Sequence, residues 1–252
     1  MKKTIIALLA LSGISLAAAP SIVWDMDFAA TGVTLKVAEG VTTTLGANVG
    51  ADIISNGAIT LNNNSFTFDQ TAGNLSYANE FTLVAKVQLG NPQPGDWPAI
   101  FGLGEDASWC WKPSYYVQAG IFNLDKDGFG GVVDETNKGS GSIAYTLPTT
   151  EGSYGDIVTL ALQNNGAGTL TLLVDGQTAG YTTITKASDF GSDKLIKKFT
   201  FGARNGGGNK ANLILHDAQF VSGLTTQIIP EPATATLSLL ALAGLAARRR
   251  RK

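Results

Sequence analysis

Alternating apolar and polar residues along the middle of the 252-residue chain restrict its fold more than any other sequence feature. In residues 81–89 every odd position is apolar, and Phe81, Leu83 and Val87 are among them. The even positions are polar apart from Val84. A period of two over nine residues predicts a β-strand with one face buried in a core.

The same alternation predicts a β-hairpin further along the chain. The apolar positions on its buried face are Val158, Leu160, Leu162, Leu170, Leu172 and Val174. Residues 164–168 are polar or small and are expected to form the turn between the two strands. Asp175-Gly176 suits a tight type I′ turn, in which both central residues need positive φ. A third strand is therefore expected at 178–184.

Strand-like stretches separated by Gly, Asn and Asp fill residues 20–222, where helix signals are scarce. The first two predicted strands are Ile22–Phe28 and Val33–Thr44. Many short strands without intervening helices favour an all-β fold in which two antiparallel sheets pack face to face, because this arrangement protects sheet edges better than an open sheet does. The length suits a single domain.

The first nineteen residues have the features of a secretory signal peptide. Lys2 and Lys3 precede an apolar run that ends in the small residues 17–19. Export machinery and signal peptidase recognise this order of charge, apolar segment and small residues. We therefore expect residues 1–19 to be removed on export and to take no part in the fold.

The C-terminus has the features of a second targeting signal. A short linker, 223–229, is expected to lead to Pro230-Glu231-Pro232, which precedes fifteen small or apolar residues and then five cations, 248–252. Fifteen helical residues span about 22 Å, whereas a bilayer core needs about 20 residues, so this transmembrane helix is short for a permanent anchor. The basic end is expected to stay in the cytoplasm.

The tripeptide Pro230, Glu231 and Pro232, the apolar helix and the basic cluster together resemble the PEP-CTERM sorting signal of Gram-negative bacteria. The resemblance implies that an exosortase-like membrane protease cuts near the tripeptide and that the helix is discarded, as the apolar tail of a GPI signal is. It implies an exported protein of the bacterial cell envelope or cell surface, anchored transiently in the inner membrane. An ordinary C-terminal membrane anchor is the alternative.

Charge argues against one class of partner. The chain has 18 Lys and Arg against 20 Asp and Glu, and seven of these cations lie in the two terminal signals. Residues 20–232 therefore keep 11 cations and 20 acids, a net charge of −9. Because such a domain repels phosphate backbones, nucleic acid is not expected to bind it.

Three segments in the middle, 57–89, 156–177 and 199–226, resemble a laminin G-like domain in order and spacing. The resemblance covers most of 20–226 and implies a jelly roll of the concanavalin A-like superfamily. Leu173 departs from it because the family often has an aromatic residue there. The chain also departs from the family at His216-Asp217, where the family usually has two acidic residues.

Residues for catalysis are scarce. Glycoside hydrolases of this superfamily need two carboxylates that flank the sugar bond, and their Glu-x-Asp-x-x-Glu motif is absent; Asp25 and Asp27 form one of the nearest carboxylate pairs. His216 is the only histidine, has no nearby nucleophile and is expected on a strand face. Cys110 is the only cysteine, either buried or a free thiol, so neither a zinc site nor an internal disulfide is expected.

Calcium is the one cofactor left open. Laminin G-like domains often bind it at one rim of the sandwich through Asp and backbone carbonyls. Residues 123–128 include Asp125 and Asp127 in a spacing similar to a calcium-binding turn, although Lys126 opposes a cation. The alternative is a plain hairpin turn.

The segment 91–116 has the most unusual composition. It contains three of the four tryptophans. Aromatic rings stack on sugar faces while neighbouring polar groups bind hydroxyls, so a glycan platform is one interpretation. The other is that these rings cover the end of the sandwich or fill its core. The residues concerned are Trp97, Trp109, Trp111, Tyr115 and Tyr116.

Two functions from different classes follow, with a third behind them. The first is a non-catalytic module that binds glycans or other extracellular ligands. The second is a structural protein of the cell envelope or extracellular matrix without a small ligand. A glycoside hydrolase is the third, and the missing carboxylate motif argues against it.

Overall fold

The computed structural model describes residues 19–29, 32–46, 54–91, 93, 98–104, 113–118, 121–126, 143–144, 148–167, 169–183, 195–203 and 210–230. For 113–118, 121–126, 143–144 and 179–183 it describes the course of the backbone only. Every regular element in these ranges is a β-strand. They include no helix with the length and apolarity to cross a membrane. The expected signal peptide up to Ala18 and the tail from Glu231 onward lie outside the described residues.

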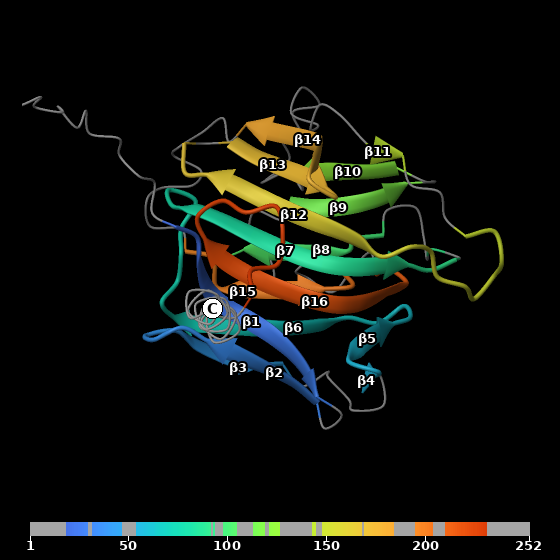
Figure 1. The fold of residues 1–252 in the computed structure, drawn as a ribbon, viewed down its shortest axis with the longest axis horizontal. Helices are drawn as coiled ribbons and strands as arrows, with labels where there is room; N and C mark the ends of the chain where they lie inside the picture. The colour runs from blue at the N-terminus through green and yellow to red at the C-terminus, as the bar shows by residue number, and fades with distance from the viewer. Residues whose placement is uncertain are drawn as a thin grey trace, which may run out of the picture.

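One layer of the molecule is a large antiparallel sheet, seen in front in Figure 1. Its strands in spatial order are β14 (Gln177–Thr183), β13 (Thr169–Val174), β12 (Val158–Asn165), β7 (Glu80–Leu89), β16 (Leu213–Ser222), β1 (Ser21–Ala29) and β2 (Gly32–Val37). Two short strands extend it, because β5 (Ala58–Leu61) pairs with β16 and β4 (Ile54–Ser55) pairs with β5.

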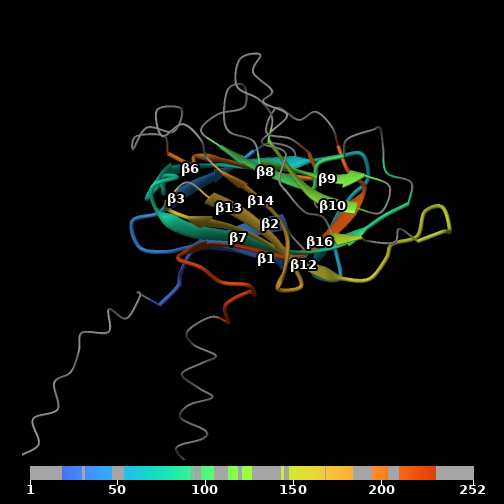
Figure 2. The same cartoon turned by 90° about the horizontal axis from the view of Figure 1, so that it is seen from above.

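The second layer consists of two smaller antiparallel sheets. One has the order β3 (Thr42–Leu45), β6 (Phe66–Ala72), β15 (Lys198–Phe201) and β8 (Phe101–Gly104). The other has the order β11 (Ile143–Ala144), β10 (Ile121–Lys126) and β9 (Pro113–Gln118), and β9 lies next to β8. Figure 2 shows this layer above the large sheet. The expected all-β fold with antiparallel sheets packed face to face is confirmed.

The core lies between the layers. All nine residues expected to face it, such as Leu83 of β7 and Leu160 of β12, belong to one buried apolar cluster with residues from β1 to β16. Trp24 of β1 is fully buried, with its ring 4.9 Å from that of Phe68 and 5.1 Å from that of Phe199 in the opposite layer. Such edge-on aromatic contacts add stability beyond the area that the rings bury.

The hairpin prediction is confirmed in register. Leu160 lies opposite Val174 and Leu162 opposite Leu172. At the Asp175-Gly176 turn both residues have positive φ, 48° and 79°, as a type I′ turn requires. The third strand follows as β14.

Three local predictions are wrong. The strand expected over 33–44 is broken, because the chain turns at Gly40, φ 78°, and β3 then pairs in the other layer. Asn164 belongs to β12 rather than to the turn, since its buried amide donates to the backbone oxygens of Tyr77 (2.8 Å) and Asn79 (2.7 Å). Residues 123–126 form part of β10 and not a turn.

Candidate functional site

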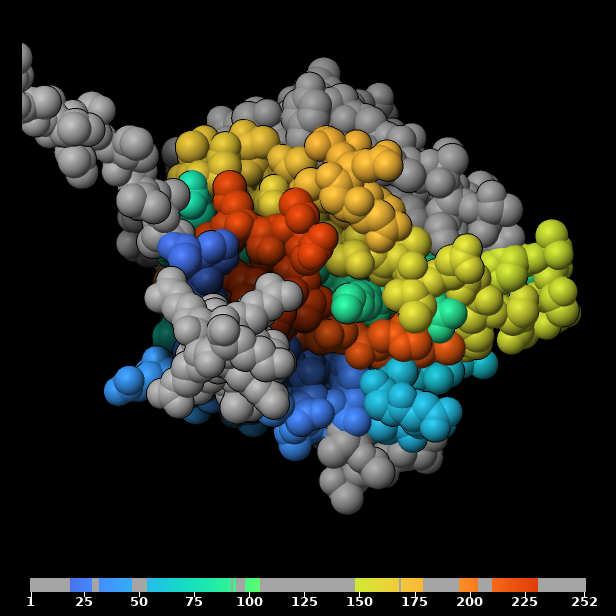
Figure 3. All heavy atoms as spheres, in the orientation of Figure 1, coloured from blue at the N-terminus to red at the C-terminus, as the bar shows by residue number. Residues whose placement is uncertain are grey.

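A polar cleft of about 340 Å³ opens at one end of the large sheet. We call it the rim cleft. Four segments meet there: the ends of β5 and β7, the start of β16, and the loop before β12. In Figure 3 these segments are cyan, teal, orange and yellow-green and adjoin at the right of the molecule. The polar side chains that line the cleft are Asn62, Asn91, Glu151, Ser153, Tyr154 and Asn212.

Backbone hydrogen bonds hold the floor of the rim cleft. The amide of Gly90 donates to the Asn212 oxygen at 2.9 Å, and Asn91 exchanges two bonds with the loop, to Ser153 (3.0 Å) and from Gly152 (2.7 Å). A Cβ on Gly90 would lie 2.9 Å from the Tyr154 ring. Glycine is therefore required at position 90 if the ring is to stay where it is.

Gln93 fixes one wall of the rim cleft. Its amide nitrogen donates to the backbone oxygens of Gly90 and Asn212, both at 2.8 Å, and its oxygen accepts from the Asn212 amide at 3.0 Å. The Asn212 side-chain oxygen accepts from the Asn63 amide at 2.7 Å. These bonds join three chain segments far apart in sequence, so the cleft is preorganised by its supporting residues.

The chemistry of the rim cleft is neutral to acidic hydrogen bonding. Asn62, Asn91 and Asn212 bring amides, Glu151 a carboxylate and Tyr154 a phenol, and the described lining includes no cation. Burial raises the pKa of Tyr154 above its ordinary value of 10.0, so its hydroxyl stays a donor at neutral pH. Groups that both donate and accept suit hydroxyl-rich ligands.

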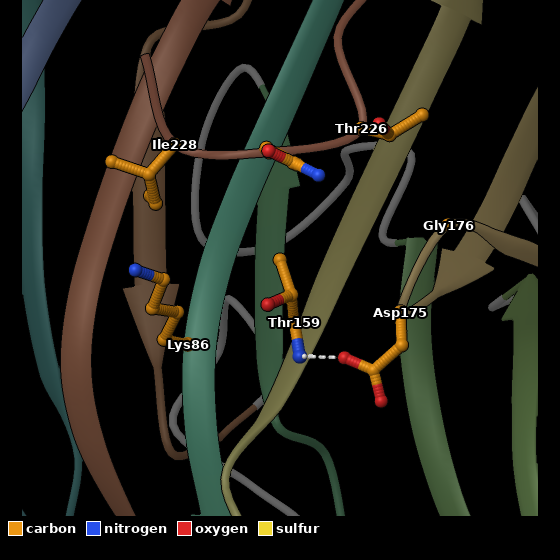
Figure 4. A pocket seen from close by; sticks show the side chains of 7 residues that line it. Lys86, Thr159, Asp175, Gly176, Thr226 and Ile228 are labelled. Carbon is orange, nitrogen blue, oxygen red and sulfur yellow. Dashed lines mark hydrogen bonds between the residues drawn. The ribbon is translucent and has the colours of Figure 1, made fainter. Parts of the chain in front are cut away.

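A second cleft, of about 280 Å³, lies on the outer face of the large sheet (Figure 4). Lys86 and Thr159 form its floor, and Thr226 to Ile228 pass over it. The Asp175 carboxylate accepts from the Thr159 amide at 2.8 Å and closes one side.

Charged groups cluster beside this second cleft. A β-bulge between Leu215 and Asp217 contains His216, whose Nε2 lies 2.6 Å from the Gln88 oxygen. Burial, followed by the Lys86 charge, lowers the pKa of His216 below its ordinary value of 6.5. The expected position of His216 on a strand face is confirmed.

Asp217 is a strongly perturbed acid beside this cleft. Burial and then the nearby Asp25 carboxylate raise its pKa from 3.8 to about 6, against the opposing charge of Lys86 and a hydrogen bond from the Ala218 amide. Asp27, the other member of the acidic pair noted in β1, lies 3.5 Å from Lys36 in an exposed ion pair.

The residues predicted to bind a ligand are only partly described. Tyr115 and Tyr116 occupy adjacent positions of β9, opposite Leu124 and Asn123 of β10. Trp97, Trp109 and Trp111, and the lone Cys110, lie outside the described residues. The glycan platform therefore stays a prediction.

The calcium prediction is equally open. Asp125 lies in β10, opposite Ser114 of β9, whereas Asp127 lies outside the described residues. In the ranges that the structure describes, no three His, Cys, Asp or Glu residues gather closely enough to hold a metal ion.

The rim cleft is hard to find in the sequence. Asn62, Tyr154 and Asn212 are separated by up to 150 positions, and none belongs to a motif. The one local sign is the run of three asparagines at 62–64, directly after a strand.

Comparison with known proteins gives the fold but no family. No family model matches the chain, and no curated protein matches it either. Among solved structures, the binding domain of botulinum neurotoxin serotype G superposes with a TM-score of 0.51 at 12% identity, over 88% of this chain and 51% of that one. The serotype D binding domain gives 0.51 at 13%, over 82% and 49%.

An enzyme shares the architecture as well. Trypanosoma rangeli sialidase in complex with 2,3-difluorosialic acid gives a TM-score of 0.52 at 15% identity, over 81% of this chain and 31% of that one. The chain thus spans about half the length of the toxin domains and a third of the sialidase. Because identities this low carry no information on function, the chain is similar to these proteins in its β-sandwich fold alone.

Proposed function

We propose that this chain is an exported, non-catalytic glycan-binding module with a jelly roll of the concanavalin A-like, laminin G-like type. The observation that carries the proposal is the rim cleft, where three amides, a carboxylate and a protonated phenol converge from four segments. Shallow clefts with such groups suit sugar hydroxyls. The β-sandwich fold is compatible with the proposal, because binding domains of botulinum neurotoxins have it too.

The ligand we propose is a neutral or cationic glycan. The described lining of the rim cleft has no cation and contains Glu151, and residues 20–232 carry a net charge of −9. Sulfated or sialylated chains would be repelled. We expect micromolar to millimolar affinity, about 4–8 kcal/mol, as for other shallow sites.

The experiment is calorimetry on the full-length protein in detergent. The probes are neutral laminari-, cello- and manno-oligosaccharides, cationic chitosan oligosaccharides and a heparin fragment. Asn62→Ala and Tyr154→Phe each remove hydrogen-bonding atoms from the rim cleft, so each should weaken binding about 2–10-fold. The control Gln177→Ala removes an exposed amide from strand β14, away from the cleft, and should bind normally.

The other outcomes separate the alternatives. Loss of binding in Trp97→Ala or Trp109→Ala, with Asn62→Ala unaffected, would move the site from the rim cleft to the aromatic platform. Absence of heat with every probe, with and without EDTA, would overturn glycan binding and favour a structural protein of the envelope or matrix.

We also propose that export and sorting act on the two ends. The support is the sequence of the two terminal signals, together with the exposed position of Pro230 at the end of the described chain. Changing Glu231 to Ala, or ending the chain at Ile229, should change where the protein accumulates. Recovery of the native protein with residues 248–252 still attached would instead indicate a plain anchor.

A further inference from the structure

Residues 223–229, expected to be a linker, lie against the outer face of the large sheet. We call this segment the C-terminal strap. Gly223 has a φ of 98°, which turns the chain back after β16. The strap then runs outside the lower layer in Figure 2, and in Figure 4 it crosses β7 and reaches the edge of β12.

Side chains of three strands hold the backbone of the strap. Thr82 of β7 donates to the Gly223 oxygen at 2.9 Å and accepts from the Thr225 amide at 3.1 Å. Gln163 of β12 donates to the Thr225 oxygen at 2.8 Å.

Gln219 of β16 holds the far end of the strap. Its side chain is 2% exposed, and its amide group exchanges two bonds with Ile229, one to the oxygen at 2.9 Å and one from the nitrogen at 2.8 Å. The Gln219 side chain thus makes the two hydrogen bonds that a neighbouring strand would make with an extended segment in a sheet. The strap is held from its first residue to the residue before Pro230.

The strap also covers an apolar patch. Val84, Ala161 and Leu173 lie side by side on the outer face and are buried, with Ile228 packed against them. Without a cover these three apolar residues would be exposed to water.

We propose that the docked strap restrains processing at Pro230-Glu231-Pro232, so that the segment must leave the sheet before a protease can cut. This inference rests on the proposed sorting function. A protease takes up its substrate as an extended chain through main-chain hydrogen bonds, and the main chain of Thr225 and Ile229 is already bonded to the domain. Release supplies seven residues, roughly 23–25 Å of extended tether between domain and membrane.

The test compares full-length proteins. Thr82→Val with Gln219→Leu removes four strap hydrogen bonds at nearly constant side-chain volume. Thr34→Val with Gln177→Leu is the matched control, because both positions are exposed in the same sheet and lie outside the strap contacts. Purified in detergent, the first variant should be cut by thermolysin within 223–229 at least about tenfold faster than the parent, and the control at the parent rate.

A second pair of variants controls for the possibility that changes within the strands disturb folding. Ile228→Asp changes the strap itself and leaves every strand intact, while Ile157→Asp changes an isoleucine that is 52% exposed. Thermolysin should cut Ile228→Asp faster within 223–229 and leave Ile157→Asp at the parent rate. Equal cleavage of all variants and parent would overturn strap docking.

The cellular measurement is the rate of tail loss in pulse-labelled exosortase-containing cells. Variants that free the strap should lose the tail severalfold faster than the parent and both controls. Equal or slower loss would overturn the restraint while leaving the sorting proposal intact. A parent that keeps its tail throughout would overturn the sorting proposal and the restraint with it, although the thermolysin result would still report docking.

Discussion

The two faces of the large sheet differ in composition and in what covers them. The inner face is apolar across β13, β12, β7, β16 and β1 and packs against aromatic rings of the second layer. The outer face is mostly polar, and beneath the strap it has an apolar cluster of Val84, Ala161 and Leu173. The inner face thus follows from period-two alternation, while the apolar exceptions Val84, Ala161 and Leu173 mark a place where another segment covers the sheet.

The largest effect should come from the inner face. Leu160→Ala should lower the free energy of unfolding by about 2–5 kcal/mol, because a fully buried side chain leaves a cavity between two packed layers. Denaturant unfolding of the variant measures this loss. The control is Leu45→Ala on edge strand β3, where the leucine is exposed and the loss should stay under about 1 kcal/mol. Equal losses at both positions would mean that the inner face carries no special share of stability.

A truncation on the outer face, which also removes fewer atoms, should cost less. Val84→Ala should lower the free energy of unfolding by about 1–2 kcal/mol, because the strap can settle toward the smaller side chain and close part of the cavity. The control Val37→Ala, at an exposed position of edge strand β2, should change it by less than about 0.5 kcal/mol. The measurement is again denaturant unfolding, and a loss as large as that of Leu160→Ala would show that the strap is as rigid as the second layer.

The smallest effect concerns charge on the outer face. The pKa of Asp217 is raised to about 6 in the folded protein, so the folded state binds its proton more tightly than the unfolded state does. The stability from this group is therefore greatest below pH 3.8 and is lost as the pH rises through about 6. Asp217→Asn removes this loss, which we put at about 1 kcal/mol after allowing for solvent screening.

Thermal unfolding of parent and Asp217→Asn between pH 4 and 8 tests this prediction. The two proteins should have similar stability at pH 4, and the variant should be the more stable at pH 8. Parallel curves across the whole range would mean that burial and the Asp25 carboxylate do not raise the pKa of Asp217 in the folded protein.

Sequence prediction works where an element depends on its own residues. The hairpin of β12 and β13 is an example, because alternation fixes its buried face and Asp175-Gly176 tolerates the positive φ of the turn. Sequence prediction fails where contacts with residues distant in the sequence determine the local structure. Asn164 has a polar side chain typical of a turn, yet backbone oxygens of Tyr77 and Asn79 stabilise it inside a strand.

The candidate site shows the same division. Aromatic residues of 91–116 draw attention in the sequence because their composition is unusual. The rim cleft does not, because its asparagines and tyrosine are ordinary residues until hydrogen bonds of Gly90, Asn91, Gln93 and Asn212 bring four segments together. A constellation of common residues from separate segments leaves no local pattern.

The sequence alone determined the strand-rich fold, the buried positions and the resemblance of both ends to targeting signals, since alternation, turn residues and charge order are local properties. Only the tertiary structure decided which segments pair, where Gly40 sends the chain to the other layer, and that residues 223–229 dock on the outer face. The physical reason is that Gln219 and Thr82 gain their partners from a segment that reaches them only after β16 has taken its place between β7 and β1.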